Sequence, residues 1–381
     1  MFGFGEKRQT TFNSSETLDW LRLARTPNIG PITFYKLLNI YGAAADALSA
    51  LPELSKRGGR KKPLKAPPAA SAEKEFRAIQ KLGGDIITAA DPRYPLALTA
   101  IDDAPPVISV LGNTALLNQS CIGMVGARNA SLNGRKLAEK LAGDLGQRGH
   151  IVVSGLARGI DTAAHVGSLK TGTIAVVAGG IDVVYPPENQ GLYEDIIQGG
   201  LVIAEAALGQ KPFAASFPRR NRIVSGLSQA VIVVEATMRS GSLITARMAG
   251  EQGRDVMAVP GSPMDPRASG PNHLIREGAT LVRSADDILE TMQNFSGQAL
   301  FDVNSIQKPL ETDFTLEENI DDVARENVLS ELSFTAVGVD ELIRTCHMSV
   351  SAMQTILLEL ELAGRIKRLP ANRVILLEYE D

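Results

Sequence analysis

Four short loops that combine glycine with polar residues are the parts of this sequence best suited to binding chemistry. They occupy residues 126–131, 154–161, 179–182 and 239–242. Glycine lets a phosphate approach the main chain, and the N-terminus of a following helix supplies N–H donors and partial positive charge. Three of the loops also carry an arginine, namely Arg128, Arg158 and Arg239. Because a guanidinium binds phosphate oxygens with two parallel hydrogen bonds, the set predicts a phosphate-rich ligand.

A second cluster of arginines lies beside an aromatic residue in the segment 217–223, Phe-Pro-Arg-Arg-Asn-Arg-Ile. Three arginines in four residues next to Phe217 are typical of a site for a polyanion whose bases stack on an aromatic ring. Nucleic acid is such a polyanion. The alternative is that the arginines form ion pairs with local carboxylates, of which the candidates are Asp161, Asp182 and Glu235.

The sequence lacks the patterns of two common nucleotide sites. The first turn has no G-x-G-x-x-G, and the second apolar run ends in Ser154-Gly155 rather than in the acid that would hold a ribose 2′-hydroxyl. No G-x-x-x-x-G-K-[ST] occurs either, which argues against a P-loop NTPase. We therefore expect no cofactor.

The glycine-bearing loops follow short apolar runs that are typical of buried strands. These runs cover residues 121–125, 151–153, 174–177, 201–204, 230–234 and 256–259. Most are rich in Val and Ile, and helical patterns such as 132–147 and 242–252 fall between most of them. This alternation predicts an α/β domain over residues 84–298, Rossmann-like, with a doubly wound parallel sheet. Ligands of such sheets bind at the carboxyl ends of the strands, where the four loops would meet.

The first 83 residues predict a helical SAM-like domain. An N-cap signal at 13–16 precedes one helical pattern, a turn follows at 26–31, and a second helical pattern comes next. This arrangement resembles a helix-hairpin-helix, which presents backbone N–H groups to DNA phosphates. The alternative is a small domain that packs on its neighbour. The segment carries 14 Lys and Arg against 7 Asp and Glu, and residues 55–71 are typical of a flexible basic loop.

The end of the chain predicts a polar linker over residues 299–318 and a winged-helix domain over residues 319–381. The domain combines three helical patterns with a hairpin, at 323–332, 339–346, 349–363 and 365–377, the hairpin turning at Pro370-Ala371-Asn372. The third helix has no Lys or Arg and two Glu, so we expect it to face protein rather than a DNA groove. A contact through the hairpin stays open because it carries Arg365, Lys367, Arg368 and Arg373.

The composition predicts a cytoplasmic globular protein. Hydrophobic residues make up 44% of the chain and charged residues 22%, and no apolar run approaches the roughly 20 residues of a membrane span. The first ten residues lack the apolar core of a secretory signal. The two cysteines, Cys121 and Cys346, match no metal spacing, and the four histidines form no ligand cluster. We expect no disulfide, no metal and no membrane contact.

Five blocks of the middle segment together resemble the DNA-processing protein A (DprA/Smf) family. They are 125–128, 154–161, 217–227, 235–236 together with 239–246, and 259–261. The resemblance implies SAM-like, Rossmann-like and winged-helix domains, and a cytoplasmic homodimer that protects incoming single-stranded DNA. It also implies loading of the RecA recombinase onto that DNA, as part of DNA processing in natural transformation (competence) and homologous recombination. In the family, the arginine corresponding to Arg128 grips phosphate, and the block that begins at Phe217 lines the same pocket.

The sequence and the resemblance together predict a set of site residues. The expected DNA-binding residues are Gly126, Arg128, Arg158, Phe217, Arg219, Arg220, Asn221, Arg222, Ser240, Gly241 and Ser242. The expected dimer contact lies around the segment that closes the sheet, with His273, Leu274, Ile275 and Leu281. The alternative for this last group is that its apolar residues pack internally.

Two rival functions remain at the level of sequence. The first is an enzyme of the nucleotide phosphoribohydrolase type, a Rossmann-like group that uses a Pro-Gly-Gly-x-Gly-Thr turn. That turn is missing here, and the candidate acids Glu205, Glu235 and Asp161 have no partner at a recognisable spacing. We therefore expect no catalysis. The second rival is a protein-binding adaptor with a vestigial pocket, which the set of arginines argues against.

Overall fold

The computed structural model describes residues 14–295, 320–369 and 372–378. The linker expected at 299–318 and the turn residues Pro370 and Ala371 lie outside this part. Contacts divide the chain into two units, one of residues Lys74–Lys308 and one that joins Met1–Glu73 with Pro309–Asp381. In the described ranges no helix is long and apolar enough to cross a membrane.

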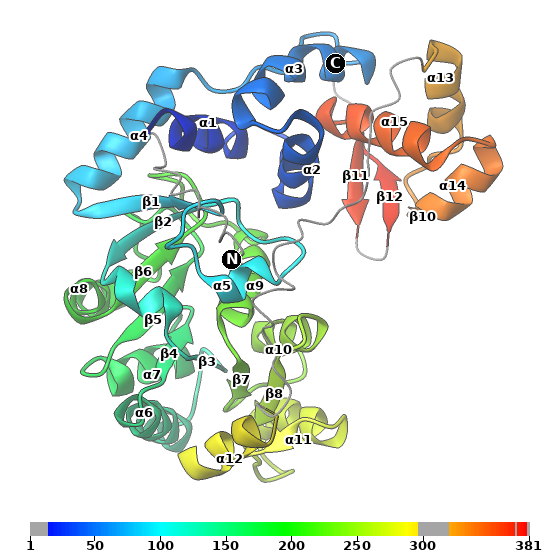
Figure 1. Cartoon of the computed structure of the whole chain (residues 1–381). Helices are drawn as coiled ribbons and strands as arrows, with labels where there is room; N and C mark the ends of the chain where they lie inside the picture. Colours follow the sequence, from blue (N-terminus) through cyan, green and yellow to red (C-terminus); the bar gives the residue numbers. More distant parts are fainter. Residues whose placement is uncertain (1–13, 296–319, 370–371, 379–381) are drawn as a thin grey trace, which may run out of the picture. The chain divides into compact units, whose positions relative to one another are not determined.

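The larger unit is built on a nine-stranded sheet with the order β1-β2-β6-β5-β4-β3-β7-β8-β9 (Figure 1). The strands expected from the sequence are all present, as β3 (Cys121–Val125), β4 (Ile151–Ser154), β5 (Thr173–Val177), β6 (Leu201–Ala204), β7 (Ala230–Val233) and β8 (Asp255–Ala258). All neighbouring pairs from β6 to β9 are parallel. The Rossmann-like, mostly parallel fold is therefore confirmed.

Two strands of this sheet, β1 (Gly84–Thr88) and β2 (Val107–Gly112), were not predicted from the sequence, whereas β9 (Thr280–Leu281) lies in the segment expected to close the sheet. β1 pairs antiparallel with β2, and β2 pairs antiparallel with β6. Only the one-turn helix α5 (Leu96–Thr99) stands between β1 and β2. The pair thus forms no βαβ unit, and the strand–helix alternation that revealed the other strands gives no signal for it.

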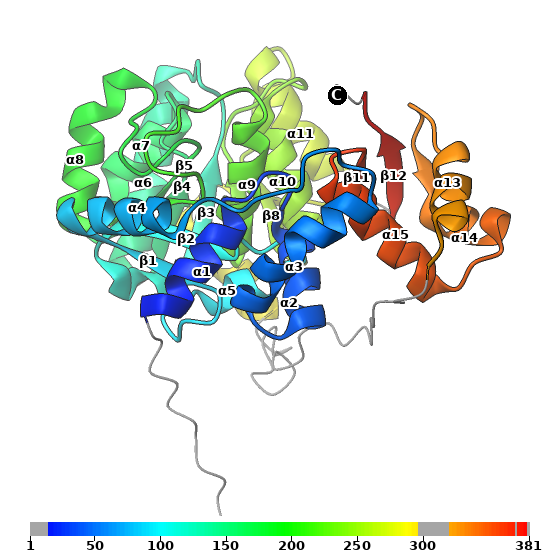
Figure 2. The ribbon, with the colours of Figure 1, turned by 90° about the horizontal axis from the view of Figure 1, so that it is seen from above.

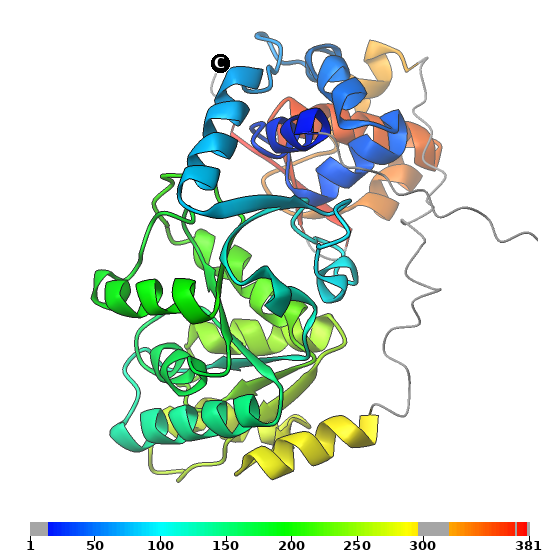
Figure 3. The same cartoon turned by 60° about the vertical axis from the view of Figure 1, so that its left-hand side comes forward.

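Helices cover both faces of the sheet. One layer holds α6 (Leu132–Gln147), α7 (Ile160–Ser168), α8 (Gln190–Gly199) and α12 (Ala285–Phe295), and the other holds α5, α9 (Ser216–Leu227), α10 (Gly241–Glu251) and α11 (Ser269–Arg276). In Figure 3, α12 (yellow) lies against the first layer, where it packs on α6. Because both faces are covered, β3 to β7 are buried along their whole length, which explains their continuous apolar runs.

The smaller unit begins with the helical domain expected at the N-terminus. It consists of α1 (Ser14–Ala24), α2 (Pro31–Tyr41), α3 (Ala44–Arg57) and the start of α4 (Ala69–Lys81). The rings of Trp20 and Phe34 lie with centroids 5.0 Å apart and link α1 to α2. Both rings are buried, so the helical pattern read from the sequence corresponds to a packed face.

The winged-helix domain completes the smaller unit. Its elements are α13 (Asp322–Ser330), β10 (Val337–Gly338), α14 (Val339–Cys346), α15 (Val350–Leu362), β11 (Ile366–Leu369) and β12 (Arg373–Leu376). The three helices and the hairpin agree with the sequence prediction, and β10 adds a third strand beside β12. Met353, Ile356 and Leu360 on α15 form its core together with Val374.

Helix α15 also packs against α3, so the two ends of the chain meet in one unit (Figure 2). Gly58, which follows α3, lies so close that a Cβ there would collide with the carbonyl oxygen of Glu359. Lys36 Nζ donates to Gln354 Oε1 at 3.2 Å, and Asn28 Nδ2 donates to the carbonyl oxygen of Leu362 at 3.4 Å. The protein that the acidic helix faces is therefore this chain's own N-terminal domain.

Candidate nucleic-acid interface

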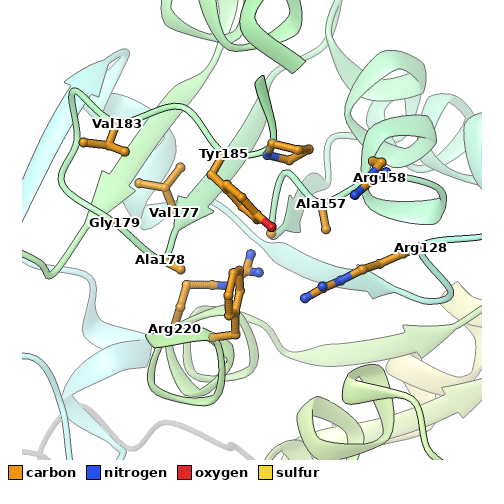
Figure 4. A pocket seen from close by; sticks show the side chains of 12 residues that line it. Arg128, Ala157, Arg158, Val177, Ala178, Gly179, Val183, Tyr185 and Arg220 are labelled. Atoms are coloured by element: carbon orange, nitrogen blue, oxygen red, sulfur yellow. The ribbon is translucent and has the colours of Figure 1, made fainter. Parts of the chain in front are cut away.

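A pocket that is partly open to solvent lies at the carboxyl ends of β3, β4 and β5. It lies beside the point where the strand order reverses, since β4 and β7 flank β3 on opposite sides. This is the usual ligand position in doubly wound sheets. The pocket is lined by Arg128, Gly155, Ala157, Arg158, Val177, Ala178, Gly179, Val183, Tyr185, Pro186, Phe217 and Arg220 (Figure 4).

Arg128 reaches this pocket because the loop that carries it is packed against its neighbours. A Cβ on Gly126 would meet Ile160 Cγ1 at 2.5 Å, so only glycine fits there. Gly159 adopts a φ of +80°, and a Cβ on it would collide with the backbone of Arg128. The amide of Ile160 also donates to the carbonyl oxygen of Ala127 at 3.2 Å. These contacts fix the arginine-bearing loop to the loop before α7.

Two aromatic rings and a guanidinium form one side of the pocket. The rings of Tyr185 and Phe217 lie with centroids 5.7 Å apart and are tilted by 55°. The guanidinium carbon of Arg128 lies 5.1 Å from the centroid of the Phe217 ring, which is cation–π distance. In Figure 4, Arg128 and Tyr185 extend into the same space from different loops. A nucleobase and its phosphate would find an aromatic face and a cation side by side.

Arg220 provides a second, buried cation at the floor of the pocket. Only 6% of the residue is exposed, and its Nη1 donates to the carbonyl oxygen of Val176 at 2.9 Å. Gly155 lies directly against the guanidinium, because a Cβ there would overlap it. The Nε atom of Arg220 is buried and has no hydrogen-bond partner in the structure. Burial lowers the pKa of Arg220, but a guanidinium keeps its proton in proteins, so the floor carries a positive charge.

Two buried titratable groups, Asp161 and His165, interact electrostatically with Arg220. Burial raises the pKa of Asp161, while the charge of Arg220 and the backbone N–H groups of Ala157 and Gly155 act in the opposite direction. Burial, reinforced by Arg220, lowers the pKa of His165 to about 3, so this imidazole is neutral. The Asp161 carboxyl accepts from the Ala157 amide at 3.3 Å. Asp161 thus holds the loop on which the Arg220 guanidinium rests.

The loop between β4 and α7 carries backbone strain next to the pocket. Leu156 is fully buried and adopts a left-handed φ of +58°, which is rare for a bulky residue. Asn189 Nδ2 donates to the carbonyl oxygen of Leu156 at 2.8 Å and holds this conformation. Strained residues of this kind gather at binding sites, where surrounding contacts impose them.

The structure places the expected site residues in three different settings. Arg128, Arg158, Phe217 and Arg220 line the pocket. Arg219, Asn221, Ser240, Gly241 and Ser242 do not line it, although Asn221 Nδ2 donates to the carbonyl oxygen of Gly241 at 3.5 Å. Ser240 caps α10 by accepting from the amide of Ser242. Ser240, Gly241 and Ser242 therefore form the start of α10, which Asn221 contacts from α9, and Arg219 is exposed on α9.

Arg222 was expected in the pocket, but it does not line the pocket and instead forms ion pairs. Its side chain is only 7% exposed, with Nη2 at 2.5 Å from Glu205 Oε1 and Nε at 3.3 Å from Asp103 Oδ2. The alternative weighed from the sequence, pairing with local carboxylates, describes this arginine. Gly126 likewise serves the packing of its loop and does not line the pocket.

Tyr185 is the pocket residue with side-chain chemistry that the sequence analysis missed. It lies two residues beyond the lining residue Val183, just after the glycine-bearing loop 179–182. It is 45% exposed although it is a large aromatic residue. The segment has no helical or strand period, so only its place after a strand-end loop could have pointed to it.

The residues expected at a dimer contact lie at the far edge of the sheet. Leu281 is on β9, the last strand in the sheet order, and is 43% exposed. His273 is exposed on α11, and Leu274 and Ile275 are partly buried there. Their exposure is compatible with a contact between copies.

Three segments of the chain match descriptions of one protein family. Residues 85–293 match DNA recombination-mediator protein A, residues 14–78 match the DprA-like N-terminal HHH domain, and residues 315–372 match the DprA winged helix domain. The DNA processing protein DprA of Streptococcus pneumoniae is 48% identical over 201 residues, which are 52% of this chain and 71% of that protein. Protein Smf of Escherichia coli is 37% identical over 312 residues, 81% of each chain.

Solved structures agree with these matches. The X-ray structure of DprA from Streptococcus pneumoniae superposes with a TM-score of 0.62 at 39% identity, covering 71% of this chain and 95% of that one. DprA from Helicobacter pylori, which binds single-stranded DNA, has a TM-score of 0.51 at 27% identity and covers 55% of this chain and 96% of that one. The expected family is confirmed, and this chain belongs to the DNA recombination-mediator protein A family, the family of the DprA and Smf proteins.

Proposed function

We propose that this protein binds single-stranded DNA in the pocket at the ends of β3, β4 and β5 and takes part in DNA processing. The observation that carries the proposal is the convergence of two cations, Arg128 and Arg220, with the aromatic pair Tyr185 and Phe217. Guanidinium groups bind phosphates and aromatic rings stack bases, which together select an unpaired nucleotide. The single-stranded DNA binding of the Helicobacter pylori relative supports this assignment.

The pocket favours a single strand over a duplex for geometric reasons. Its floor is the buried guanidinium of Arg220, so a ligand must enter the space between loops to reach it. A splayed nucleotide can do so, whereas the bases of a duplex are stacked and paired. The aromatic faces are sequence-tolerant because every base has a π-face. We therefore propose little sequence preference.

We also propose that the pocket binds without catalysing hydrolysis. Each acid that sequence reasoning offered as a catalytic candidate has a structural partner. Glu235 accepts from the amide and the hydroxyl of Ser131 at 2.8 and 2.6 Å, and Glu205 pairs with Arg222. Asp161 is buried, and its carboxyl accepts from the Ala157 amide. A general base needs access to a substrate proton or water, and these contacts occupy the carboxylates.

The direct test is binding to labelled oligonucleotides of equal length, single-stranded and duplex, at two salt concentrations. Affinity for the single strand should exceed that for the duplex by about tenfold or more, equivalent to the ~1–3 kcal/mol that one stacked base contributes. Both affinities should fall with rising salt, because phosphate binding releases counterions. Equal losses of single-strand and duplex affinity in Arg128→Ala would refute the pocket assignment.

The recombination-mediator description of the family supports a further step. We propose that the protein delivers bound strands to the RecA recombinase and acts as a cytoplasmic homodimer through α11 and β9. β9 has only two residues and forms the outer edge of the sheet, and one of them, Leu281, is exposed. An edge strand offers unpaired backbone groups to a second copy.

Leu281→Glu is expected to convert the dimer into monomers, because it places a charge in an apolar contact. Light scattering at micromolar concentration checks the mass of the parent and the variant. Leu82→Glu, at a leucine of similar exposure that precedes β1 at the opposite end of the sheet, gives the same change in charge and is the control. A parent that is monomeric at this concentration refutes the dimer, and a dimer that survives Leu281→Glu places the contact elsewhere.

A further inference from the structure

Helix α15, the third helix of the winged domain, is covered on more than one side. Its residues face the winged-domain core and also α3, and nine of its thirteen residues are buried. Glu359 is one of these, where it pairs with Arg325 at 2.8 Å. Its carbonyl oxygen contacts the position of Gly58. A recognition helix enters the major groove with an exposed face, and α15 has no such face with positive charge.

Exposed positive charge in the smaller unit gathers instead on the loop that follows α3. Of the eleven residues from Ser55 to Lys65, six are Lys or Arg and none is Asp or Glu. Lys56, Arg57, Lys61, Lys62 and Lys65 are exposed, and Arg60 is half-buried. We name this segment, residues 55–65, the basic loop.

The basic loop is held in place, in contrast to the flexible loop expected from its composition. Leu64 is buried, and its amide donates to Ser55 Oγ at 2.8 Å. Ser55 is fully buried as well, and its backbone oxygen accepts from the Arg60 amide at 3.0 Å. The cations between these anchors are therefore displayed on a fixed turn, which lowers the entropy lost when they bind a partner.

The winged domain adds cations next to the basic loop. A Cβ on Gly59, whose φ is +89°, would meet the guanidinium Nη1 of Arg365 at 3.0 Å. Lys367, two residues further on β11, is exposed. Two ion pairs are formed in these segments, Glu53 with the loop residue Arg57 at 3.3 Å and Glu361 with Arg368 at 3.2 Å. Arg365 thus lies against the basic loop, so both ends of the chain contribute cations to this surface.

We propose that this surface, the basic loop together with Arg365 and Lys367, is a second DNA site that binds the phosphate backbone of duplex DNA. The loop has no aromatic residue on which a base could stack, and its one large apolar residue, Leu64, is buried. A lipid surface would favour exposed apolar residues beside the charges, which the loop lacks. Double-stranded DNA offers the highest density of phosphates, so a purely cationic surface binds it without sequence preference.

This site is independent of the pocket, and its test separates the two. The loop variant is Lys62→Glu with Lys65→Glu, and the matched control is Lys140→Glu with Lys170→Glu, two exposed lysines of the larger unit that give the same change in charge. Binding of the full-length protein to duplex DNA is measured across salt concentrations. A single strand of about four nucleotides, sized for one pocket, serves as the second ligand.

The loop variant is expected to lose duplex affinity by about tenfold or more at low salt, with a salt slope shallower by about two units, one for each lost phosphate contact. Its affinity for the short single strand should stay within about twofold, whereas Arg128→Ala should show the opposite pattern. Lys62→Gln with Lys65→Gln should lose less than the charge reversal.

Unchanged duplex affinity in the loop variant would overturn the proposal. An equal loss in the control variant would do the same, because it would show an effect of net charge alone. Cosedimentation with vesicles of phosphatidylserine and phosphatidylcholine measures whether the parent and the loop variant bind a membrane surface. If only vesicle binding is lost, the surface belongs to a membrane contact and the duplex proposal is wrong. Failure of the short single strand to bind the parent would refute the pocket instead.

Discussion

Arg128→Ala is expected to weaken binding to every single-stranded oligonucleotide by roughly 30-fold, equivalent to the ~2 kcal/mol of a charge-assisted hydrogen bond. The slope of log affinity against log salt should become shallower by about one unit, because one phosphate contact is lost. Arg128→Lys keeps the charge but loses the bidentate geometry, so it should recover only part of the affinity. Fluorescence anisotropy over a salt series measures all three.

Phe217→Ala is compared with Arg128→Ala, because it removes an aromatic ring from the same pocket without changing the charge. Removal of the ring takes away a stacking surface but no charge, so the salt slope should remain near that of the parent. The Arg128 guanidinium lies over this ring, however, and loses its support in the variant. The double variant should therefore be less impaired than the sum of the two single losses. Parent-like melting temperatures must accompany the comparison, since Phe217 is half-buried. If both single variants fold and bind as the parent does, the site lies elsewhere.

Much of the larger unit could be predicted from the sequence because its strands obey one simple rule. A parallel strand that is covered on both faces must be apolar throughout, and the runs from Cys121 to Val125 and from Ala230 to Val233 satisfy this rule. The loops at the strand ends then follow from topology alone. β1 and β2 follow a different rule, because an antiparallel pair needs no helix between its strands.

The roles of the arginines within the segment 217–223 could not be read from their number. On a helix, neighbours three apart share a face, whereas residues two apart point in directions about 200° apart. Phe217 and Arg220 therefore line the pocket together, and Arg222 is directed toward Glu205 and Asp103. A helical reading of the block would have separated these roles. The contact between Gly58 and Glu359 on α15 could not be predicted in this way, because the two residues lie 301 positions apart in the sequence.

The second large effect is expected at Gly155, which carries no charge and makes no contact with DNA through a side chain. A methyl group at this position would overlap the Arg220 guanidinium, so Gly155→Ala should displace the buried cation from the pocket floor. The φ of Gly155 is not in the left-handed region, so the backbone tolerates alanine there. We expect a loss of single-strand affinity of about 10- to 100-fold, the size expected when a buried charged contact is removed. Gly191→Ala on α8, where a Cβ meets nothing, is the matched control.

A double-mutant cycle with Arg220→Met tests whether the two residues act as one. If Gly155 acts only by seating Arg220, the double variant should bind no more weakly than Arg220→Met alone. Arg220→Met removes the cation near buried Asp161, so thermal melting must show that it folds. Should it fail to fold, Arg220→Lys replaces it, and Gly155→Ala should then cost less than in the parent, because the shorter ammonium side chain avoids the added methyl group. Additive losses would mean that Gly155 contributes to binding through its own backbone. If Gly155→Ala binds DNA as the parent does, the position of the Arg220 guanidinium on the pocket floor is not needed for DNA binding.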